Sequence, residues 1–159
     1  MENIDKIDRQ ILNIIQKNAK ISHREIAEKL NLSRTPILDR IKKLERRGVI
    51  QKYITILDRK KIDKTMIILC SISIKQHSIE LVSEFQKIIG TFNQVMECYQ
   101  IGGSYDFFLK VVVNNVEEYQ TFVLKNLSQI KNISNVQSSF VIGELKNTHF
   151  YELDELNKK

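Results

Sequence analysis

The segment SRTPILDRIKKLERRG, Ser33 to Gly48, holds the densest group of side chains that could bind an anion. Six of its sixteen residues are Lys or Arg. Guanidinium and ammonium groups form charge-assisted hydrogen bonds with phosphate oxygens, so a polyanion suits such a segment. The segment also keeps Ile37, Ile41 and Leu44 within about 60° of one another around a helix. We therefore expect an amphipathic helix with one apolar and one cationic face.

The outward face of this expected helix differs from that of an ordinary solvated helix. It consists of Thr35, Asp39, Lys42 and Arg46, flanked by Leu38 and Lys43. Solvated helices usually interleave both signs of charge at i, i+4, whereas this face becomes cationic toward its C-terminal half. Its first turn offers short hydrogen-bonding and apolar groups, and the first turn of a recognition helix reaches base edges in the major groove. The pattern favours a DNA-binding helix over a solvated one.

The ends of this helix are marked in the sequence. Ser33 or Thr35 is available as the N-cap, and Pro36 falls in the first turn, where its missing N–H costs little. Gly48 follows two arginines and suits the position just beyond the helix, which often requires a left-handed backbone. The sequence therefore predicts a helix that ends at Arg46 or Arg47.

Two further helices are expected upstream. The first carries isoleucines at i, i+4, i+7 and i+8, with Asn3 or Asp5 as its N-cap. The second begins at Ser22 and Glu25, which have the spacing of a capping box, and Ile21 can pack on its first turn. A short polar turn separates the second helix from the third. This order of helices predicts a helix-turn-helix.

Charge divides the chain into two parts. Residues 1–64 contain 17 Lys and Arg against 9 Asp and Glu, and residues 65–159 contain 8 against 10. The first part is therefore net +8 and the second net −2, which gives the +6 of the whole chain. A general need for solubility does not explain this segregation. We expect two domains, of which the first faces a polyanion.

The two expected domains meet in a charged segment. Val49 to Leu57 is rich in β-branched and aromatic residues and predicts a wing or an outgoing strand. The following DRKKIDK predicts a hinge. We assign residues 1–57 to a winged helix-turn-helix DNA-binding domain, 58–64 to the hinge and 65–159 to a second domain.

Strand and helix patterns alternate in the second domain. Strands are expected within residues 65–76, 95–103, 105–113 and 136–146, and helices within 78–90 and 116–130. A tight Gly-rich turn should join the second and third strands. The first of these helices has Ile79, Val82, Phe85 and Ile89 at helical spacing. Residues 148–159 could add a further strand.

The order β-α-β-β-α-β is typical of an α+β ferredoxin-like fold. Such a four-stranded sheet has both helices on one face and leaves the other face to be covered. Because apolar side chains occur on both faces of the expected strands, we expect a second copy of the chain to cover the open face.

The composition excludes several classes of protein. Hydrophobic residues make up 42% and charged residues 28% of the chain, and no apolar run approaches the roughly 18 residues of a membrane span. The N-terminus lacks the pattern of a signal peptide, so we expect a cytoplasmic protein with no membrane partner. Cys70 and Cys98 lie in apolar runs and are expected to be reduced core residues. The three histidines have no metal-ligand spacing, and we expect neither a metal nor a cofactor.

The chain resembles the Lrp/AsnC (feast/famine) transcriptional regulators over nearly its whole length. Two motifs carry the resemblance, LSRTPILDRIKKLERRGVI in the helical domain and MECYQIGGSYDFFLKV in the second domain. The family implies a DNA-binding domain joined by a hinge strand to a small-molecule-binding domain. It also implies amino acids as the usual effectors and dimers that assemble into tetramers or octamers.

The resemblance implies a set of residues for contact with double-stranded DNA. The recognition helix matches Ser33 to Arg47. Its candidates for groove contact are Arg34, Thr35, Leu38, Asp39 and Lys42, with Ser33 as a further DNA-binding residue and Arg46 nearer the phosphates. His23 and Arg24, at the start of the second helix, could bind backbone phosphate, although ordinary exposed side chains would look the same.

The resemblance also implies an effector loop, commonly Gly-acidic-aromatic-Asp in this family. The candidate effector-binding residues are Gly102, Gly103, Ser104, Tyr105, Asp106 and, as a weaker match on the last strand, Ser138 and Ser139. Ser104 replaces the usual acidic residue, which leaves the identity of the effector open. If an amino acid binds, its ammonium group is expected against Asp106 and its carboxylate against the loop N–H groups. A bare hairpin turn is the alternative.

The sequence leaves two other functions open. Siroheme decarboxylases of the haem pathway are built from the same two domains, but they need basic side chains in the second domain to hold a polycarboxylate. Here that half is net negative and contains no arginine. The other alternative is an architectural DNA-binding protein without an effector. Neither a nucleophile elbow nor a phosphate loop is present, so we expect a regulator and not an enzyme.

Overall fold

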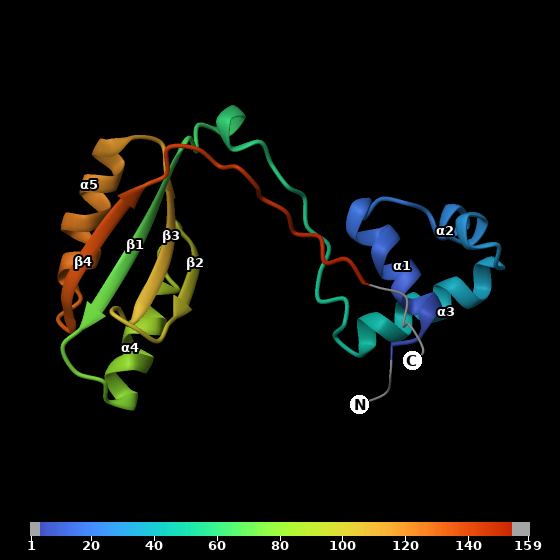
Figure 1. The fold of residues 1–159 in the computed structure, drawn as a ribbon, viewed down its shortest axis with the longest axis horizontal. Helices are drawn as coiled ribbons and strands as arrows, with labels where there is room; N and C mark the ends of the chain where they lie inside the picture. Colours follow the sequence, from blue (N-terminus) through green and yellow to red (C-terminus); the bar gives the residue numbers. More distant parts are fainter. Residues whose placement is uncertain (1–3, 154–159) are drawn as a thin grey trace. The chain divides into compact units, whose positions relative to one another are not determined.

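The computed structural model describes residues 4–153, which form two compact units. The first unit contains residues up to 56 together with 146–153, and the second contains residues 57–145. Figure 1 shows the helical first unit and the sheet of the second. The expected division had domains at 1–57 and 65–159 with a hinge at 58–64, whereas residues 57–64 here belong to the second unit and residues 146–153 to the first.

The first unit contains the three expected helices, α1 (Lys6–Lys17), α2 (His23–Leu30) and α3 (Arg34–Arg46). Asp5 is the N-cap of α1 and accepts a hydrogen bond from the N–H of Asp8 at 2.8 Å. Ser22 and Glu25 form the predicted capping box of α2. The other N-cap candidate, Asn3, lies outside the described residues.

One apolar core orients the three helices. It consists of Ile11, Leu12, Ile15, Ile26, Ala27, Ile37, Ile41 and Leu44. Burial of each large aliphatic side chain contributes about 1.5–3 kcal/mol, so this core determines which face of α3 points outward. The predicted apolar stripe of the third helix is confirmed.

The C-terminus of α3 has the backbone geometry that the sequence predicted. Gly48 has φ of +69°, in the left-handed region that favours glycine. Its N–H donates to the carbonyl of Glu45 at 2.9 Å, and the N–H of Val49 donates to that of Leu44 at 3.0 Å. These two bonds form a Schellman motif, which satisfies carbonyls at the helix end.

The strand expected over residues 49–57 is not present in the described structure. Residues 51–58 run without helix or strand. A strand needs a neighbouring edge for its N–H and C=O groups, and no described segment forms a ladder with this one. Its side chains Ile54, Ile56 and Leu57 are correspondingly exposed.

The second unit is an antiparallel four-stranded sheet with two helices. The elements in chain order are β1 (Met66–Ile74), α4 (Ile79–Ile89), β2 (Val95–Gln100), β3 (Phe107–Val113), α5 (Val116–Lys125) and β4 (Ile133–Phe140). The strand order is β2-β3-β1-β4. Short 3-10 turns occupy Arg59–Ile62 and Leu127–Gln129. This is the predicted ferredoxin-like arrangement, and the α+β class is confirmed.

Both helices pack on the same face of the sheet. Ile68, Cys70 and Ile72 of β1 belong to a core that includes Phe85 of α4 and Tyr119 of α5. Successive strand residues point to opposite faces. The intervening residues of β1 therefore belong to the other face, on which no helix of the second unit packs.

Three details of the second unit differ from the sequence expectation. Ile79 is the first residue of α4 and is 82% exposed, because it precedes the part of the helix that contacts the sheet. Cys98 lies exposed on the edge strand β2, whereas Cys70 is buried as expected. β4 begins at Ile133, before the apolar pattern that was used to predict it. In the first unit, residues 148–153 form none of the strand expected within 148–159, of which residues 154–159 lie outside the described residues.

Candidate functional site

The outward face and the first turn of α3 present the residues predicted to contact DNA. Arg34, Thr35, Asp39, Lys42 and Arg46 are all exposed. None of these five side chains belongs to the core of the first unit, so all are available to a ligand.

The start of α3 completes this surface. Leu38 is half-buried on the flank of the outward face. Ser33 is the N-cap by backbone geometry, but its side chain makes no capping hydrogen bond. Its hydroxyl can therefore serve as a donor or acceptor to a bound molecule.

A surface hollow of about 490 Å³ lies over the second half of this face, lined by Asp39, Lys42, Glu45 and Arg46. Glu45 also accepts a hydrogen bond from the hydroxyl of Tyr53 at 2.8 Å. Burial and this carboxylate together raise the pKa of Tyr53 to about 12. The contact attaches the segment after α3 to the helix itself.

Arg40 is a positioning residue that sequence reasoning did not single out. Its Nη1 lies 2.6 Å from Asp5 Oδ2 and 2.7 Å from Asp8 Oδ1. Asp8 is only 6% exposed, the one charged residue buried among the described residues. Burial acts to raise the pKa of Asp5, but the Asp8 N–H and the Arg40 guanidinium outweigh it and lower that pKa. The contact fixes α3 to the N-terminus of α1.

His23 and Arg24 occupy the first two positions of α2, as predicted. Arg24 forms an i, i+4 ion pair with Glu28 at 2.9 Å, and its side chain remains 81% exposed. Such exposed pairs exchange readily with other partners because they contribute little free energy. The pair therefore leaves Arg24 able to contact a phosphate.

The predicted effector loop joins β2 to β3 and is longer than the expected tight turn. It spans residues 101–106, and the Ile101 N–H donates to the carbonyl of Asp106 at 2.9 Å. Gly103 has φ of +137°, which only glycine adopts without strain. The loop therefore has a defined shape that depends on its glycines.

Asp106 fixes this loop to the end of β1. Its Oδ2 accepts the N–H of Ile74 at 2.8 Å, and its Oδ1 lies 2.6 Å from Nε2 of His77. These two contacts, the Ile74 N–H first, hold the pKa of Asp106 below its usual range. His77 was not predicted to belong to the loop, because the two residues lie far apart in the sequence.

The structure separates the other predicted effector residues. Tyr105 donates its hydroxyl hydrogen to Oε1 of Gln137 on β4, a residue that the sequence did not indicate. Ser138 faces the helices and hydrogen-bonds to Tyr119. Ser139 pairs with Leu69 and points to the open face. The loop therefore meets β4 at Gln137, and the two serines do not share one surface.

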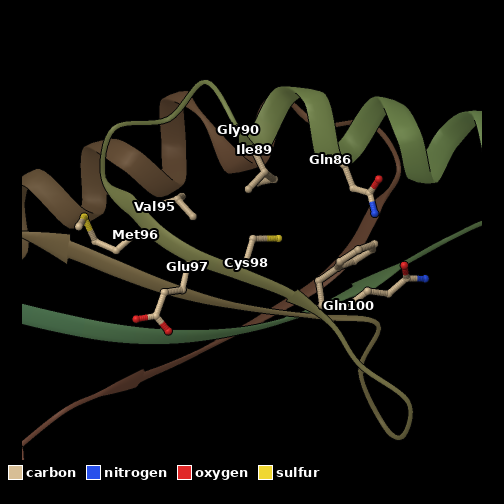
Figure 2. A pocket seen from close by; sticks show the side chains of 9 residues that line it. Gln86, Ile89, Gly90, Val95, Met96, Glu97, Cys98 and Gln100 are labelled. Atoms are coloured by element: carbon tan, nitrogen blue, oxygen red, sulfur yellow. The ribbon is translucent and has the colours of Figure 1, made fainter. Parts of the chain in front are cut away.

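A second hollow, of about 380 Å³, lies between α4 and the edge strand β2 (Figure 2). It is lined by Gln86, Ile89, Gly90, Val95, Met96, Glu97, Cys98, Gln100 and Phe107. In Figure 2, Ile89 and Cys98 face each other, while Glu97 points away from the helix. None of the predicted effector residues lines it.

Two kinds of feature are absent between residues 4 and 153. No group of three His, Cys, Asp or Glu side chains is placed to hold a metal ion. No helix in that range has the length and apolar composition needed to cross a bilayer.

Comparison with protein families agrees with this geometry. The winged helix-turn-helix DNA-binding family matches residues 4–51. The Lrp/AsnC ligand binding domain matches residues 67–149, more than half of the chain. The chain belongs to the Lrp/AsnC family. The two matches cover the helical unit and the sheet unit in the order that the structure shows.

Individual relatives extend the match over nearly the full length of the Lrp/AsnC chain. The transcriptional regulator AzlB of Bacillus subtilis is 35% identical over 153 residues, which is 96% of this chain and 98% of the relative. The leucine-responsive regulatory protein of Haemophilus influenzae is 31% identical over 150 residues, 94% of this chain and 90% of the relative.

Solved structures of other transcriptional regulators share the fold. An AsnC family transcriptional regulator from Agrobacterium tumefaciens has a TM-score of 0.91 and 33% identity, covering 96% of this chain and 99% of its own. A transcriptional regulator from Neisseria meningitidis, solved as an L-Met complex, has a TM-score of 0.88 and 27% identity, covering 92% and 95%.

These findings establish the class of the protein. It is a DNA-binding transcriptional regulator of the Lrp/AsnC family and not an enzyme, because its close relatives over the whole chain are regulators. The relatives named above are regulators, which favours this class over the siroheme decarboxylase alternative.

Proposed function

We propose that this regulator binds operator DNA by placing the first half of α3 in the major groove. The observation that carries the proposal is the exposed outward face of α3, which runs from Thr35 to Arg46, with Arg34 exposed beside it as the first residue of the helix. An arginine at the start of the helix can bind guanine O6 and N7 with two hydrogen bonds. Arg46, together with His23 and Arg24 at the start of α2, contacts phosphates and fixes the docking angle.

The proposed ligand of the sheet unit is an amino acid or a similar small molecule. Glycine-rich backbone at Gly102 and Gly103 can direct N–H groups toward a carboxylate. Asp106 already binds Ile74 and His77, yet a carboxylate has about four lone-pair sites and retains room for an ammonium donor. The L-Met complex of the relative from Neisseria meningitidis supports this class of ligand.

The proposed assembly is a homodimer that associates further into a tetramer or octamer. The face of the sheet opposite the helices carries Leu69 and Phe108, which are half-buried, and Tyr99, which is 52% exposed. The exposed segment at Ile54 and Ile56 also needs an edge with which to pair. A second copy meets both needs, since it offers the same apolar surfaces.

One set of titrations tests the proposed function. Duplexes selected from random DNA by the protein, and scrambled versions of them, are titrated with and without millimolar L-methionine or L-leucine. We expect tighter, salt-dependent binding to the selected duplexes and a change in affinity or assembly on adding an effector. Because its proposed ligand is chromosomal DNA, the proposed location of the regulator is the cytoplasm.

A second candidate is an architectural DNA-binding protein that responds to no effector. It is favoured by Ser104, which removes an acidic side chain from the loop. The same titrations separate the two functions. Operator affinity and assembly that stay constant with each of the common amino acids would support the architectural function.

A further inference from the structure

Residues 146–153 return to the first unit and pack on α1. The Asn13 side chain donates Nδ2–H to the carbonyl of Leu153 at 2.9 Å and accepts the Leu153 N–H on Oδ1 at 3.1 Å. Gln16 likewise donates Nε2–H to the carbonyl of Tyr151 at 3.1 Å and accepts the Tyr151 N–H on Oε1 at 2.9 Å. Two side-chain amides of the helix thus take the place of a neighbouring strand, and four hydrogen bonds hold the segment.

The spacing of these residues makes the arrangement specific. Asn13 and Gln16 are three residues apart and lie on one face of α1. Tyr151 and Leu153 are two residues apart, so in an extended segment they present their backbone groups to the same side. Next to these hydrogen bonds, Lys17 Nζ lies 5.0 Å from the ring centre of Phe150. We name this set of contacts the α1 clamp.

The α1 clamp also has an apolar component. Leu153 packs against the core of the three helices. Asn13 is half-buried, and its amide would lose two hydrogen bonds if the segment detached. Unmet hydrogen bonds at partly buried groups cost free energy, so the attached state is favoured.

The clamp changes how the two units are connected. The chain leaves the first unit near residue 56 and re-enters it near residue 146, so two segments join the units. On the side of the second unit, Arg59 and Glu144 form an ion pair at 2.8 Å between the outgoing and the returning segment. The matched family regions end at residues 51 and 149, so Tyr151 and Leu153 lie outside both.

We propose that residues 146–153 are a second tether, which restricts the orientation of the helix-turn-helix unit and thereby fixes the half-site spacing that the assembled regulator accepts. A unit held by one flexible segment can sample many orientations, and a second attachment removes most of them. The inference rests on the proposed function only in that the operator contains two half-sites.

The first test measures the clamp without DNA. Hydrogen exchange followed by mass spectrometry on the full-length protein should show slow exchange at the amides of Tyr151 and Leu153, both of which donate to the clamp. In the Asn13→Ala/Gln16→Ala variant these amides should exchange at least about tenfold faster. Both alanines favour the helix, so α1 itself stays folded. Exchange in the wild type at the rate of an unstructured peptide would overturn the proposal.

The second test measures spacing. Duplexes carry two half-sites at the preferred distance or at a distance changed by about 5 bp, half a helical turn. The wild type should bind the preferred spacing more tightly than the changed one. In the clamp variant the ratio of these two affinities should be at least about fivefold smaller, while the affinity for a single half-site should stay within about twofold of the wild-type value. Deletion of residues 148–159 should reduce the discrimination to the same extent. Combining the deletion with the two alanine substitutions should reduce it no further.

The outcomes separate this inference from the proposed function. Equal discrimination by the wild type and the clamp variant would overturn the tether, as would a wild type that accepts both spacings. A wild type that binds no duplex selectively would refute the proposed function instead, and the exchange rates would then decide whether the clamp exists.

Discussion

Arg34 is the first residue of α3 and Arg46 is the last, and their positions predict different roles. Arg34→Ala should cost about 1–3 kcal/mol of binding free energy on the preferred duplex and relax selectivity at one base step. Arg46→Ala should weaken binding to all sequences alike and lower the salt slope by about 1. Titrations of preferred and scrambled duplexes at several salt concentrations measure both quantities.

Lys87 is a suitable control for these arginines, because it is a cation of α4 in the second unit. Lys87→Ala should leave both selectivity and the salt slope unchanged. If Arg34→Ala and Arg46→Ala give equal losses on every duplex, Arg34 does not contact a base.

Asp106 makes stability depend on pH in a predictable direction. Its pKa is lowered in the folded state by the Ile74 N–H and by His77, so the folded protein prefers the carboxylate. The corresponding stability is present above the ordinary aspartate pKa of about 3.9 and is lost as the pH falls through the lower, folded value. Asp106→Asn should therefore reduce the free energy of unfolding by about 1 kcal/mol at pH 7, a modest value because solvent screens the pair.

Urea denaturation of the wild type and Asp106→Asn at pH 7 and at pH 3 measures this difference. The gap between the two proteins should be smaller at the lower pH, because the stability that the carboxylate contributes declines as the pH falls from the ordinary aspartate pKa toward the lower, folded value. A gap of the same size at both pH values would show that the charge of Asp106 does not hold the loop.

At the scale of elements, the attachment of α3 to α1 depends on Arg40. Arg40→Met would leave the nearly buried carboxylate of Asp8 without its ionic partner. We expect the first unit to lose about 2 kcal/mol of stability, because uncompensated charge in a buried position is costly. Affinity for all DNA sequences should fall in parallel, since α3 is less well held. Thermal unfolding and titrations measure the two effects.

Two variants serve as controls for Arg40. Arg24→Met removes an exposed pair with Glu28 and should hardly change the melting temperature. Adding Asp8→Asn to Arg40→Met should restore part of the lost stability, because the uncompensated charge is then gone. No recovery in the double variant would mean that Arg40 acts through its aliphatic stem.

Local signals explain why the helices and most strands could be predicted from sequence. Capping residues such as Ser22, apolar spacing and the left-handed Gly48 act within a few residues, so the sequence displays them directly. The segment 49–57 failed as a strand prediction because β-rich composition does not supply an edge with which to pair. The early start of β4 was missed because its first residues pair with β1 without an alternating apolar pattern.

The candidate site was predictable only in part, and for the same reason. The outward residues of α3 follow from helical geometry and charge. The contacts of Arg40 with Asp5 and of Asp106 with His77 join residues about thirty positions apart, and the α1 clamp joins residues far more distant. Spacing along the chain carries no information about such contacts, because the fold alone brings these residues together.

At the scale of the whole molecule, we expect a symmetric dimer or a multiple of it on DNA. A single small helical unit buries little surface on DNA, and the open face of the sheet needs a partner. The preferred DNA should be an imperfect palindrome with half-sites about one helical turn, or a multiple, apart. Sedimentation at micromolar concentration measures the assembly, and a stable monomer would contradict this expectation.

The most direct test of the account is the affinity of the wild type for a selected duplex and for its scrambled version over a range of salt concentrations. The account predicts that the logarithm of the binding constant falls linearly with that of the salt concentration for both. It also predicts that the selected duplex binds at least about a thousandfold more tightly at physiological salt. Equal affinity for the two duplexes at every salt concentration would contradict it, because the outward face of α3 would then contact phosphates and read no bases.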